Sequence, residues 1–306
     1  MSKMVNQIGI LSRNRAFYPT SDLLIETNRR TNINGVFLDT QKTSAYLAQN
    51  PDVLIYNYSL RSLGCIVPRI GRSQTDFGVI ILKQLEILGI PTTLSSQALE
   101  NSRNKFRSYQ LLRSLRGVQI PKTILIQDIS YFDEIIKRFK FPIVLKIVNS
   151  SQGIGTILVP SKRLAKEILA SIFLSGQQSI MIQEFLAPNI NQLPESRPED
   201  IRIFVVGDEV IGAMRRVAKK GEWRTNFAQG ADCFPYSPTE EEIDLSLKIS
   251  NLFGIEITGI DFLHNTKGLS VLEVNACPGW KAIEQVNPGL HPAKKIIDYA
   301  IQKMKK

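Results

Sequence analysis

The feature that most constrains the fold is a pair of apolar segments near the C-terminus, separated by a short polar stretch. Residues 257–263 read Ile-Thr-Gly-Ile-Asp-Phe-Leu, and residues 269–279 read Leu-Ser-Val-Leu-Glu-Val-Asn-Ala-Cys-Pro-Gly. Short apolar runs on either side of a polar turn that contains glycine are typical of a β-hairpin. We therefore expect two paired strands with their turn at residues 264–268.

Polar side chains interrupt both of these strands. Alternate residues of a strand share a face, so Glu273 and Asn275 point the same way, and Asp261 on the neighbouring strand can join them. Two carboxylates and an amide oxygen are hard ligands suited to magnesium, which usually brings substrate phosphates with it. The alternative is an ordinary wet strand face. The apolar neighbours favour the metal site, because buried charges are usually paired or metal-bound.

Size and composition are those of a globular protein with a substantial core. The chain has 306 residues, which predicts two or three domains, with 43% hydrophobic and 22% charged residues. We find no transmembrane run and no signal peptide. The three cysteines, Cys65, Cys233 and Cys277, have no paired spacing. This argues against disulfides or a zinc site and predicts a cytoplasmic location.

Charge and histidine content narrow the chemistry. Only His264 and His291 are present, which disfavours a catalytic triad built on histidine or a multi-histidine metal site. The formal charge of +10 favours acidic partners such as nucleotides, carboxylate substrates or nucleic acid, without choosing among them.

Residues 1 to about 95 read as an α/β unit. Short apolar runs at 8–11, 35–38 and 52–55 predict buried strands, and residues 76–88 predict a helix that ends at Gly89. Strands that alternate with helices predict a parallel sheet. The first strand is not followed by G-x-G-x-x-G, and the chain contains no P-loop motif, so neither of these nucleotide sites is expected.

The rest of the chain predicts two further units of strands and helices. In the first, Ser102 is expected to cap a helix that runs to about residue 115, followed by four strands at residues 123–126, 143–148, 156–159 and 179–184 and a helix at residues 130–140. A loop at residues 187–199 leads to the second unit. There we expect strands at residues 201–206 and 210–215, a capped helix at residues 239–253, the hairpin described above, and a terminal helix from about Pro292.

Cations lie in two places where phosphates or carboxylates might be bound. Lys146 interrupts an apolar strand, which predicts either a phosphate contact or a snorkelling edge-strand lysine. It is followed by a loop with Gly153 and Gly155, whose backbone N–H groups could bind phosphate. The basic segment 214–226, which contains Trp223, is suited to carboxylate or phosphate recognition. It could equally be a solvated hairpin or a nucleic-acid patch with a stacking tryptophan.

The order of these motifs resembles the RimK-like ATP-grasp amino-acid ligases, from about Pro68 to the C-terminus. The matching stretches are residues 68–71, 102–108, 144–146, 152–155, 183–185, 200–202, 206–210, 224–226, 273–276 and 278–279. The resemblance implies an α/β (α+β) ATP-grasp fold, with ATP sandwiched between two α+β subdomains. The implied divisions are an N-terminal pre-ATP-grasp domain at residues 1–97, a central subdomain at residues 98–186 and a C-terminal subdomain with the metal site at residues 187–306.

The same resemblance implies a role for individual positions. The residues expected at the phosphates and in a lid over them are Lys105, Lys146, Gly153 and Gly155. Those expected at adenine and ribose are Gln183, Glu184, Phe185, Leu186 and Asp200. Those expected where phosphate meets substrate are Arg224, Thr225 and Asn226. Two magnesium ions, with manganese as an alternative, would bind Asp261, Glu273 and Asn275. Arg202 and Arg215 are our catalytic candidates for gripping a substrate carboxylate or the oxyanion.

The implied activity is a Mg-ATP-dependent carboxylate–amine ligase that works through an acyl phosphate. Its substrates would be an amino acid, with glutamate favoured, and a carboxylate acceptor on a protein, peptide or coenzyme. A homodimer or homotetramer is implied, without a membrane or a specific nucleic acid as partner. The alternatives are a biosynthetic small-molecule ATP-grasp ligase, a nucleotide sensor that has lost activity, and a non-catalytic nucleic-acid-binding protein.

Three features depart from the family pattern. Asn104 stands where aspartate is common, so its contact near the nucleotide is in question. The loop at residues 187–199 is longer than usual. Trp280, after the metal strand, could line the acceptor pocket or be a buried structural residue.

Overall fold

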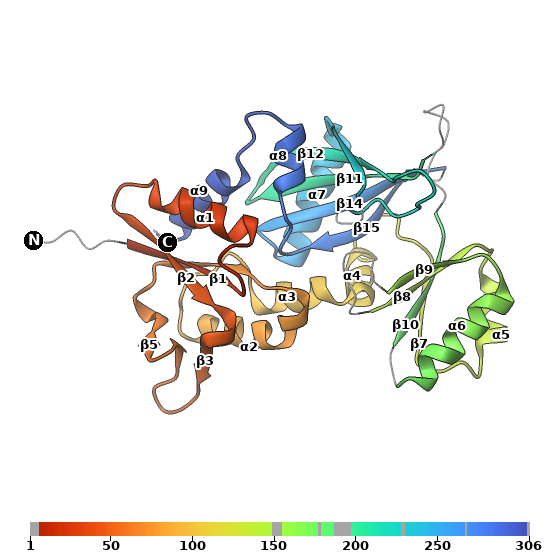
Figure 1. Cartoon of the computed structure of the whole chain (residues 1–306), viewed down its shortest axis with the longest axis horizontal. Coiled ribbons are helices and arrows are strands. Elements are labelled where there is room, and N and C mark those ends of the chain that lie inside the picture. The colour runs from red at the N-terminus through yellow and green to blue at the C-terminus, as the bar shows by residue number, and fades with distance from the viewer. Residues whose placement is uncertain are drawn as a thin grey trace, which may run out of the picture.

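Three units, each built around a β-sheet, follow one another along the chain (Figure 1). The computed structural model describes residues 6–148, 155–176, 179–186, 197–227, 230–266 and 268–304. The N-terminal unit lies at one end of the molecule, the five-stranded sheet lies beside it, and the four-stranded sheet lies at the far end (Figure 1). None of the helices in these ranges is both long enough and apolar enough to cross a membrane.

The N-terminal unit contains the expected parallel sheet, but one of the three expected strands lies in another sheet and a different strand takes its place. Its strands in the order β2-β1-β6 are β2 (Ile33–Asp39), β1 (Asn6–Ser12) and β6 (Cys65–Arg69). The run at residues 52–55 is a strand but does not join this sheet. It is β4 (Asp52–Ile55) of a small antiparallel sheet with β3 (Thr43–Tyr46) and β5 (Tyr58–Ser59). The third parallel strand, β6, is fully buried and contains Pro68.

Helices complete this unit and lead to the next. The elements are α1 (Tyr18–Asn28), η1 (Thr40–Lys42), η2 (Leu60–Ser62), η3 (Arg72–Gln74), α2 (Thr75–Ile87), α3 (Ser96–Arg103) and α4 (Lys105–Leu112). The expected cap at Ser102 is wrong, because Ser102 lies inside α3. Asn104 is the cap of α4, and its side-chain oxygen accepts hydrogen bonds from the N–H groups of Phe106 and Arg107. Asparagine is favoured here because it satisfies donors that the first helical turn leaves unpaired.

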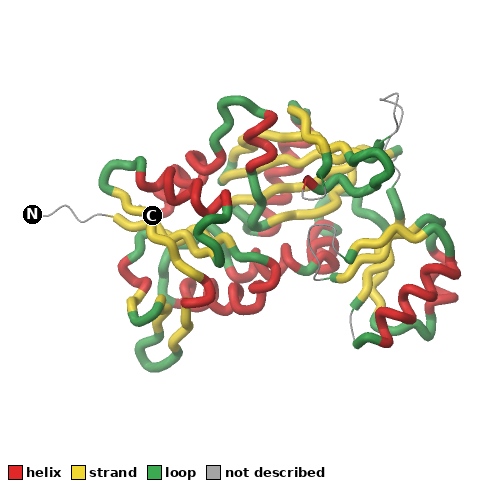
Figure 2. Tube along the Cα trace, in the orientation of Figure 1, coloured by secondary structure: helices red, strands yellow, loops and turns green. Residues whose placement is uncertain are grey.

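The central unit is a four-stranded antiparallel sheet in the order β7-β10-β8-β9. Its strands are β7 (Thr123–Ile126), β8 (Ile143–Ile147), β9 (Thr156–Val159) and β10 (Ile180–Glu184). The helices α5 (Phe132–Ile135), η4 (Ile136–Arg138) and α6 (Lys162–Leu174) form a hydrophobic core with this sheet, and it is separate from the other cores. Figure 2 shows α5 and α6 on the outer side of the sheet.

The C-terminal unit is a five-stranded antiparallel sheet in the order β13-β12-β11-β14-β15. Its strands are β11 (Glu199–Val206), β12 (Glu209–Val217), β13 (Asp232–Pro235), β14 (Ile257–Asn265) and β15 (Gly268–Asn275), and its helices are α7 (Glu240–Phe253), α8 (Lys281–Val286) and α9 (Pro292–Met304). The expected hairpin is present as β14 and β15. The expected cap of α7 is also present, with Thr239 and Glu242 forming a capping box.

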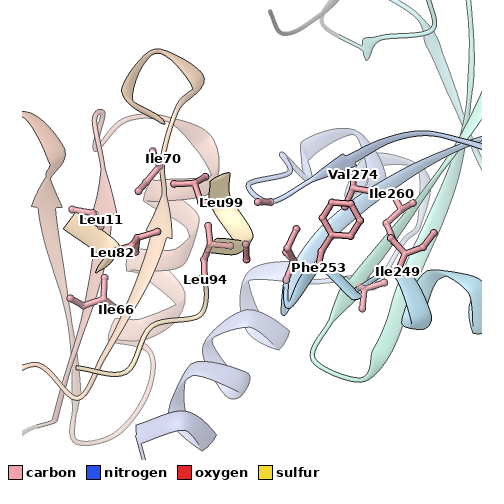
Figure 3. Close-up of a cluster of buried hydrophobic side chains, with 14 of the residues drawn as sticks. Leu11, Ile66, Ile70, Leu82, Leu94, Leu99, Ile249, Phe253, Ile260 and Val274 are labelled. Carbon is pink, nitrogen blue, oxygen red and sulfur yellow. The ribbon is translucent and has the colours of Figure 1, made fainter. Parts of the chain in front are cut away.

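Two hydrophobic clusters join the N-terminal and C-terminal units. In one, Leu82 and Leu99 belong to the same cluster as Phe253 and Ile260 (Figure 3). The other packs β1 and α1 against Trp280 and α9. The four-stranded unit has a core of its own, but Val148 and Met181 of this unit also belong to the first cluster, so it packs against the base that the other two units form.

Candidate active site

The candidate site is a cleft between the four-stranded and five-stranded sheets. Its wall from the central unit includes Val144, Lys146 and Gln183, and its wall from the C-terminal unit includes Asp261 and Glu273. Both groups come from antiparallel strands, so alternate side chains face the cleft while the others enter the cores. The site therefore depends on two sheets that are distant in sequence.

One end of the cleft is largely apolar and is built where β10 ends. Phe185 packs edge-on against Trp223, with ring centroids 6.3 Å apart, and Leu186 lines the same cavity. Gln183 is 2% exposed, and its amide donates to the Thr123 hydroxyl at 2.8 Å. A cavity with aromatic and aliphatic walls and nearby backbone groups can hold a purine base.

Strand β10 is fixed in register at this end of the cleft by its last residue. The Glu184 carboxylate accepts a hydrogen bond from the Lys122 backbone at 2.7 Å, and the Glu184 N–H donates to the Lys122 carbonyl oxygen at 2.9 Å. The segment that follows β10 is thereby held against the cleft.

Two lysines face the middle of the cleft. Lys105 is the first residue of α4, and Lys146 lies on β8. Burial lowers the pKa of Lys146 to about 8, nearby Lys105 adds to this effect, and Glu273 opposes it. Burial also lowers the pKa of Lys105, again against the attraction of Glu273. Burial and mutual repulsion both disfavour the charged forms of these two lysines. The phosphate oxygens of a polyanion would offset both effects, so the pair suits such a ligand.

Carboxylates and arginines alternate along the wall that the C-terminal unit contributes to the cleft. The register pairs Arg202 with Asp261, and Asp261 with Glu273. Arg202 donates two hydrogen bonds to the Asp261 carboxylate, at 2.6 and 2.7 Å. Arg216 donates two to Asp200 at 2.6 Å and also lies 3.0 Å from Asp261. This ladder of paired charges fixes the orientation of its carboxylates.

Asp261 and Glu273 stay ionised despite burial, whereas burial raises the pKa of Asp200. Burial raises the pKa of Asp261, but the guanidinium groups of Arg202 and Arg216 outweigh it, and the pKa lies below its ordinary value. The same holds for Glu273, where burial is outweighed by Lys105 and Arg72. Arg72 donates to Glu273 at 2.6 Å. Both carboxylates are therefore available as anions at neutral pH.

The structure brings Arg216, not Arg215, to the cleft. Arg215 pairs in register with Ile201, on the opposite face of the sheet. Its side chain lies 3.3 Å from Glu199 and packs over the Phe234 ring. Counting back from the turn at Gly207 in a regular hairpin would place Arg215 opposite Asp200. A register shift between Phe204 and Val205 moves the pairing by one residue, and a shift of one residue exchanges the two faces of a strand.

The remaining expected residues are mostly near the cleft. Arg224, Thr225 and Asn226 line it, and the Thr225 hydroxyl donates to Asp200. Asn275 shares the Glu273 face of β15, and its amide donates to the Gly259 carbonyl oxygen at 3.4 Å. Gly155 begins the approach to β9, with φ of +71°.

Some expected features fall outside the site or outside the described residues. Gly153 and residues 187–196 lie outside the described residues. Trp280 is a buried structural residue that donates to Asp22 at 2.8 Å, so it does not line an acceptor pocket.

The basic segment is largely matched by carboxylates. Besides the pairs made by Arg215 and Arg216, Lys219 lies 2.5 Å from Asp232 and Arg224 lies 3.2 Å from Glu222. A nucleic-acid patch requires cations that can be turned toward phosphates. These pairings favour the interpretation of the segment as part of the cleft wall.

The donor set fits magnesium held by few protein groups. Among the described residues no group of three or more histidine, cysteine, aspartate or glutamate side chains is placed to hold a metal ion. Asp261 and Glu273 are adjacent across β14 and β15, and Asn275 adds an amide on the same face. Magnesium commonly binds one or two carboxylates together with water and substrate phosphates, so this set suits a metal that arrives with a nucleotide.

A cleft between two antiparallel sheets, with lysines on one side and paired carboxylates on the other, defines an ATP-grasp enzyme. A model of the RimK-like ATP-grasp domain matches residues 102–300, and a model of the RimK pre-ATP-grasp domain matches residues 7–99. The chain belongs to the RimK-like ATP-grasp family and is an ATP-dependent ligase. The expected family and fold class are confirmed.

Curated relatives agree with this assignment, and solved structures share the fold. A probable alpha-L-glutamate ligase of Stutzerimonas stutzeri is 34% identical over 295 residues, covering 96% of this chain and 94% of that protein. One of Azotobacter vinelandii is 33% identical with the same coverage. The ATP-grasp ligase PsnB, solved with a phosphomimetic variant of a minimal precursor, Mg and ADP, has a TM-score of 0.73 at 18% identity, covering 99% of this chain and 100% of that one. A RimK domain protein from Sphaerobacter thermophilus has a TM-score of 0.72 at 16% identity, covering 96% and 99%.

The sequence missed Arg216 and Arg72 as site residues. The signal for Arg216 was a second arginine beside Arg215, but only the register shift selects it. Arg72 directly follows the family stretch at residues 68–71, yet nothing local connects it to a strand two hundred residues later.

Proposed function

We propose that this protein is a Mg-ATP-dependent carboxylate–amine ligase that joins an amino acid to a carboxylate acceptor through an acyl phosphate. The observation that carries the proposal is the meeting of Lys105 and Lys146 with Asp261 and Glu273 in one cleft. Phosphoryl transfer from ATP needs positioning and charge neutralisation more than it needs a protein nucleophile. The cleft supplies both without a histidine.

Each wall has a separate task. Phe185 and Leu186 hold the base, while Lys105 and Lys146 hold phosphate oxygens. Magnesium bound at Asp261 and Glu273 would neutralise charge on the transferring phosphate. Asn275 completes the set of ligands for one or two ions.

The reaction has two steps. A carboxylate oxygen of the acceptor attacks the γ-phosphorus of ATP, the bond to the bridging oxygen breaks, and ADP leaves. The amino group of the amino acid then attacks the acyl carbon, phosphate leaves with the C–O electron pair, and the ammonium proton is lost to solvent. Arg202 does not itself line the cleft, but it is paired in register with Asp261 and donates two hydrogen bonds to that carboxylate. From there its guanidinium would stabilise the oxyanion of the second step.

The names of relatives guide the choice of substrates. Glutamate is favoured as the amino acid because the curated relatives are named as probable alpha-L-glutamate ligases. A peptide or protein acceptor is favoured because PsnB was solved with a precursor peptide. We propose a cytoplasmic enzyme that acts as a homodimer or homotetramer.

The test is magnesium-dependent phosphate release from ATP, measured with each amino acid in the presence and absence of acidic peptides. We expect release that requires one amino acid together with an acceptor. Glu273→Gln should abolish it, whereas Glu241→Gln, at an exposed position in the first turn of α7, should not. Unchanged turnover in folded Glu273→Gln would refute the metal assignment, and failure of the wild-type protein to bind ATP would refute the function.

A further inference from the structure

A second cavity, of about 690 Å³, lies outside the nucleotide cleft in the N-terminal unit. It lies beyond the carboxyl ends of β2 and β6, which flank β1 on opposite sides of the parallel sheet. In open parallel sheets this crevice, where the strand order changes direction, is the usual place for a ligand. The volume is in the range of cavities that bind small molecules or the end of a peptide.

The wall of this cavity is polar and carries more positive than negative charge. Arg72 and Arg103 line it together with Thr40, Gln74 and the exposed Asp76. The N-terminus of α2, a helix of 13 residues, also faces it, and such an end attracts anions. Taken together, these groups suit an anion, and a planar guanidinium matches a carboxylate or a phosphate. The proposed ligase function, which requires a carboxylate acceptor, favours the carboxylate.

Hydrogen bonds to the protein hold both arginines in place at the cavity wall. The Nη2 of Arg103 donates to the Ile70 carbonyl oxygen, while its Nε is buried without a hydrogen-bond partner among the described residues. Arg72 uses Nη1 to bind the Arg103 carbonyl oxygen at 3.3 Å and Nη2 to bind Glu273 at 2.6 Å. The Arg103 Nε is closed off from solvent, so an anion in the cavity would be attracted by the charge of the two guanidinium groups and would exchange with one of these existing hydrogen bonds.

Arg72 connects the two cavities. Its side chain is 13% exposed and spans from the second cavity to Glu273, on the wall of the nucleotide cleft. An anion held by Arg72 therefore lies one side chain away from a proposed metal ligand. Because Glu273 and that anion would compete for the same guanidinium, neutralising Glu273 releases Arg72 toward the second cavity.

We propose that this second cavity binds the carboxylate end of the acceptor substrate, with Arg72 and Arg103 as its cationic wall. The inference rests on the proposed ligase function, because it places the acceptor beside the transferring phosphate. It also makes acceptor binding and metal binding mutually supportive. A divalent cation at Glu273 frees Arg72 for the acceptor, and by reciprocity a bound acceptor draws Arg72 from Glu273 and favours the cation.

The cavity wall offers a variant that changes charge with little change in shape. The Gln74 side-chain oxygen accepts a hydrogen bond from the Thr40 hydroxyl at 2.8 Å, and glutamate at this position can accept the same bond. Gln74→Glu therefore adds a negative charge to the wall while keeping the local packing. Arg72→Met removes the connecting cation, and Arg107→Met, in which the lost arginine is exposed and pairs with Glu100, is the matched control.

The experiment measures binding by calorimetry without ATP, using acetylated triglutamate, its C-terminal amide and free glutamate as probes. We expect the acetylated triglutamate to bind, with affinity lowered about tenfold or more by Gln74→Glu and by Arg72→Met and unchanged by Arg107→Met. A loss on amidation would assign the site to a C-terminal carboxylate, and equal binding of the amide would assign it to a side-chain carboxylate. Both results support the proposal.

Glu273→Gln provides an independent readout that does not depend on turnover. Although this variant should be inactive, we expect it to bind the peptide more tightly than the wild-type protein in the absence of magnesium, because Arg72 is released. The proposal would be overturned if the peptide did not bind, or if neither Gln74→Glu nor Arg72→Met changed its affinity. If these two substitutions weakened the binding of free glutamate but not that of the peptide, the assignment of the cavity to the acceptor would be overturned. Wild-type ATP turnover in the same samples would show that the ligase function stands even if this cavity assignment fails.

Discussion

The buried charge of Lys146 should lower the free energy of unfolding of the protein when no ATP is bound. Its pKa is lowered from 10.5 to about 8, and a difference of this size corresponds to about 3 kcal/mol of cost for the charged form. The side chain is partly exposed to the cleft, so screening by solvent reduces the expected cost to about 1–2 kcal/mol. We therefore predict that Lys146→Met raises the free energy of unfolding by about 1–2 kcal/mol near neutral pH, while weakening ATP binding.

The pH dependence gives this prediction its sign. An unfolded chain keeps the lysine protonated up to about its ordinary pKa of 10.5, whereas the folded protein releases the proton near 8. The unfolded state binds more protons between these values, so the folded state gains stability as the pH rises through this window. The penalty is complete below about pH 8 and is lost toward pH 10.5, and the advantage of Lys146→Met should disappear with it.

Urea unfolding at about pH 7 and about pH 10 measures this effect. Lys137→Met is the matched control, because Lys137 is 66% exposed and should change stability little at either pH. A Lys146→Met protein that is less stable than wild type near pH 7, or one whose advantage is unchanged near pH 10, would refute the reasoning.

Three further predictions concern the five-stranded sheet. Arg216→Met should cost about 3–5 kcal/mol in urea unfolding because it leaves buried carboxylates unpaired, whereas Arg215→Met on the other face should cost less than about 1 kcal/mol; equal losses would contradict the assigned register. Asn275→Ala should raise the magnesium concentration needed for half-maximal turnover by about tenfold or more, and an unchanged magnesium titration would remove this residue from the ligand set. Gly207→Ala should lower stability by about 1–3 kcal/mol in thermal melts, because its φ is +59° and an added Cβ would lie 2.7 Å from the Tyr299 ring; a wild-type melting temperature would show that the turn relaxes at no cost.

Local patterns predicted the elements that carry the site. The alternation of apolar and polar residues placed Asp261 and Glu273 on one face of a hairpin, and the register confirms that they are opposite each other. Lys146 stood out because it interrupts an apolar strand, and it lines the cleft. The prediction of a cap at Ser102 failed because Ser102 and Asn104 are both good caps and are separated by one residue.

Local sequence patterns could not predict where the chain departs from regular strands and regular strand pairing. A single register shift in β11 and β12 exchanged the roles of Arg215 and Arg216. Strand β6 was overlooked because a proline lies within it, although it is buried at the edge of the parallel sheet. Neither feature changes the periodicity of the sequence enough to be detected from it.

The sequence by itself determined the class of enzyme, the two strands that carry the candidate metal ligands and the position of Lys146 on a strand. These depend on side-chain alternation and on motif order, both of which are properties of short stretches of chain. Only the tertiary structure decided that the two sheets face each other and that Arg72 reaches Glu273 from a strand end far away in sequence. Such contacts depend on how separate hydrophobic cores pack, and that packing is set by the shapes of whole units rather than by any local pattern.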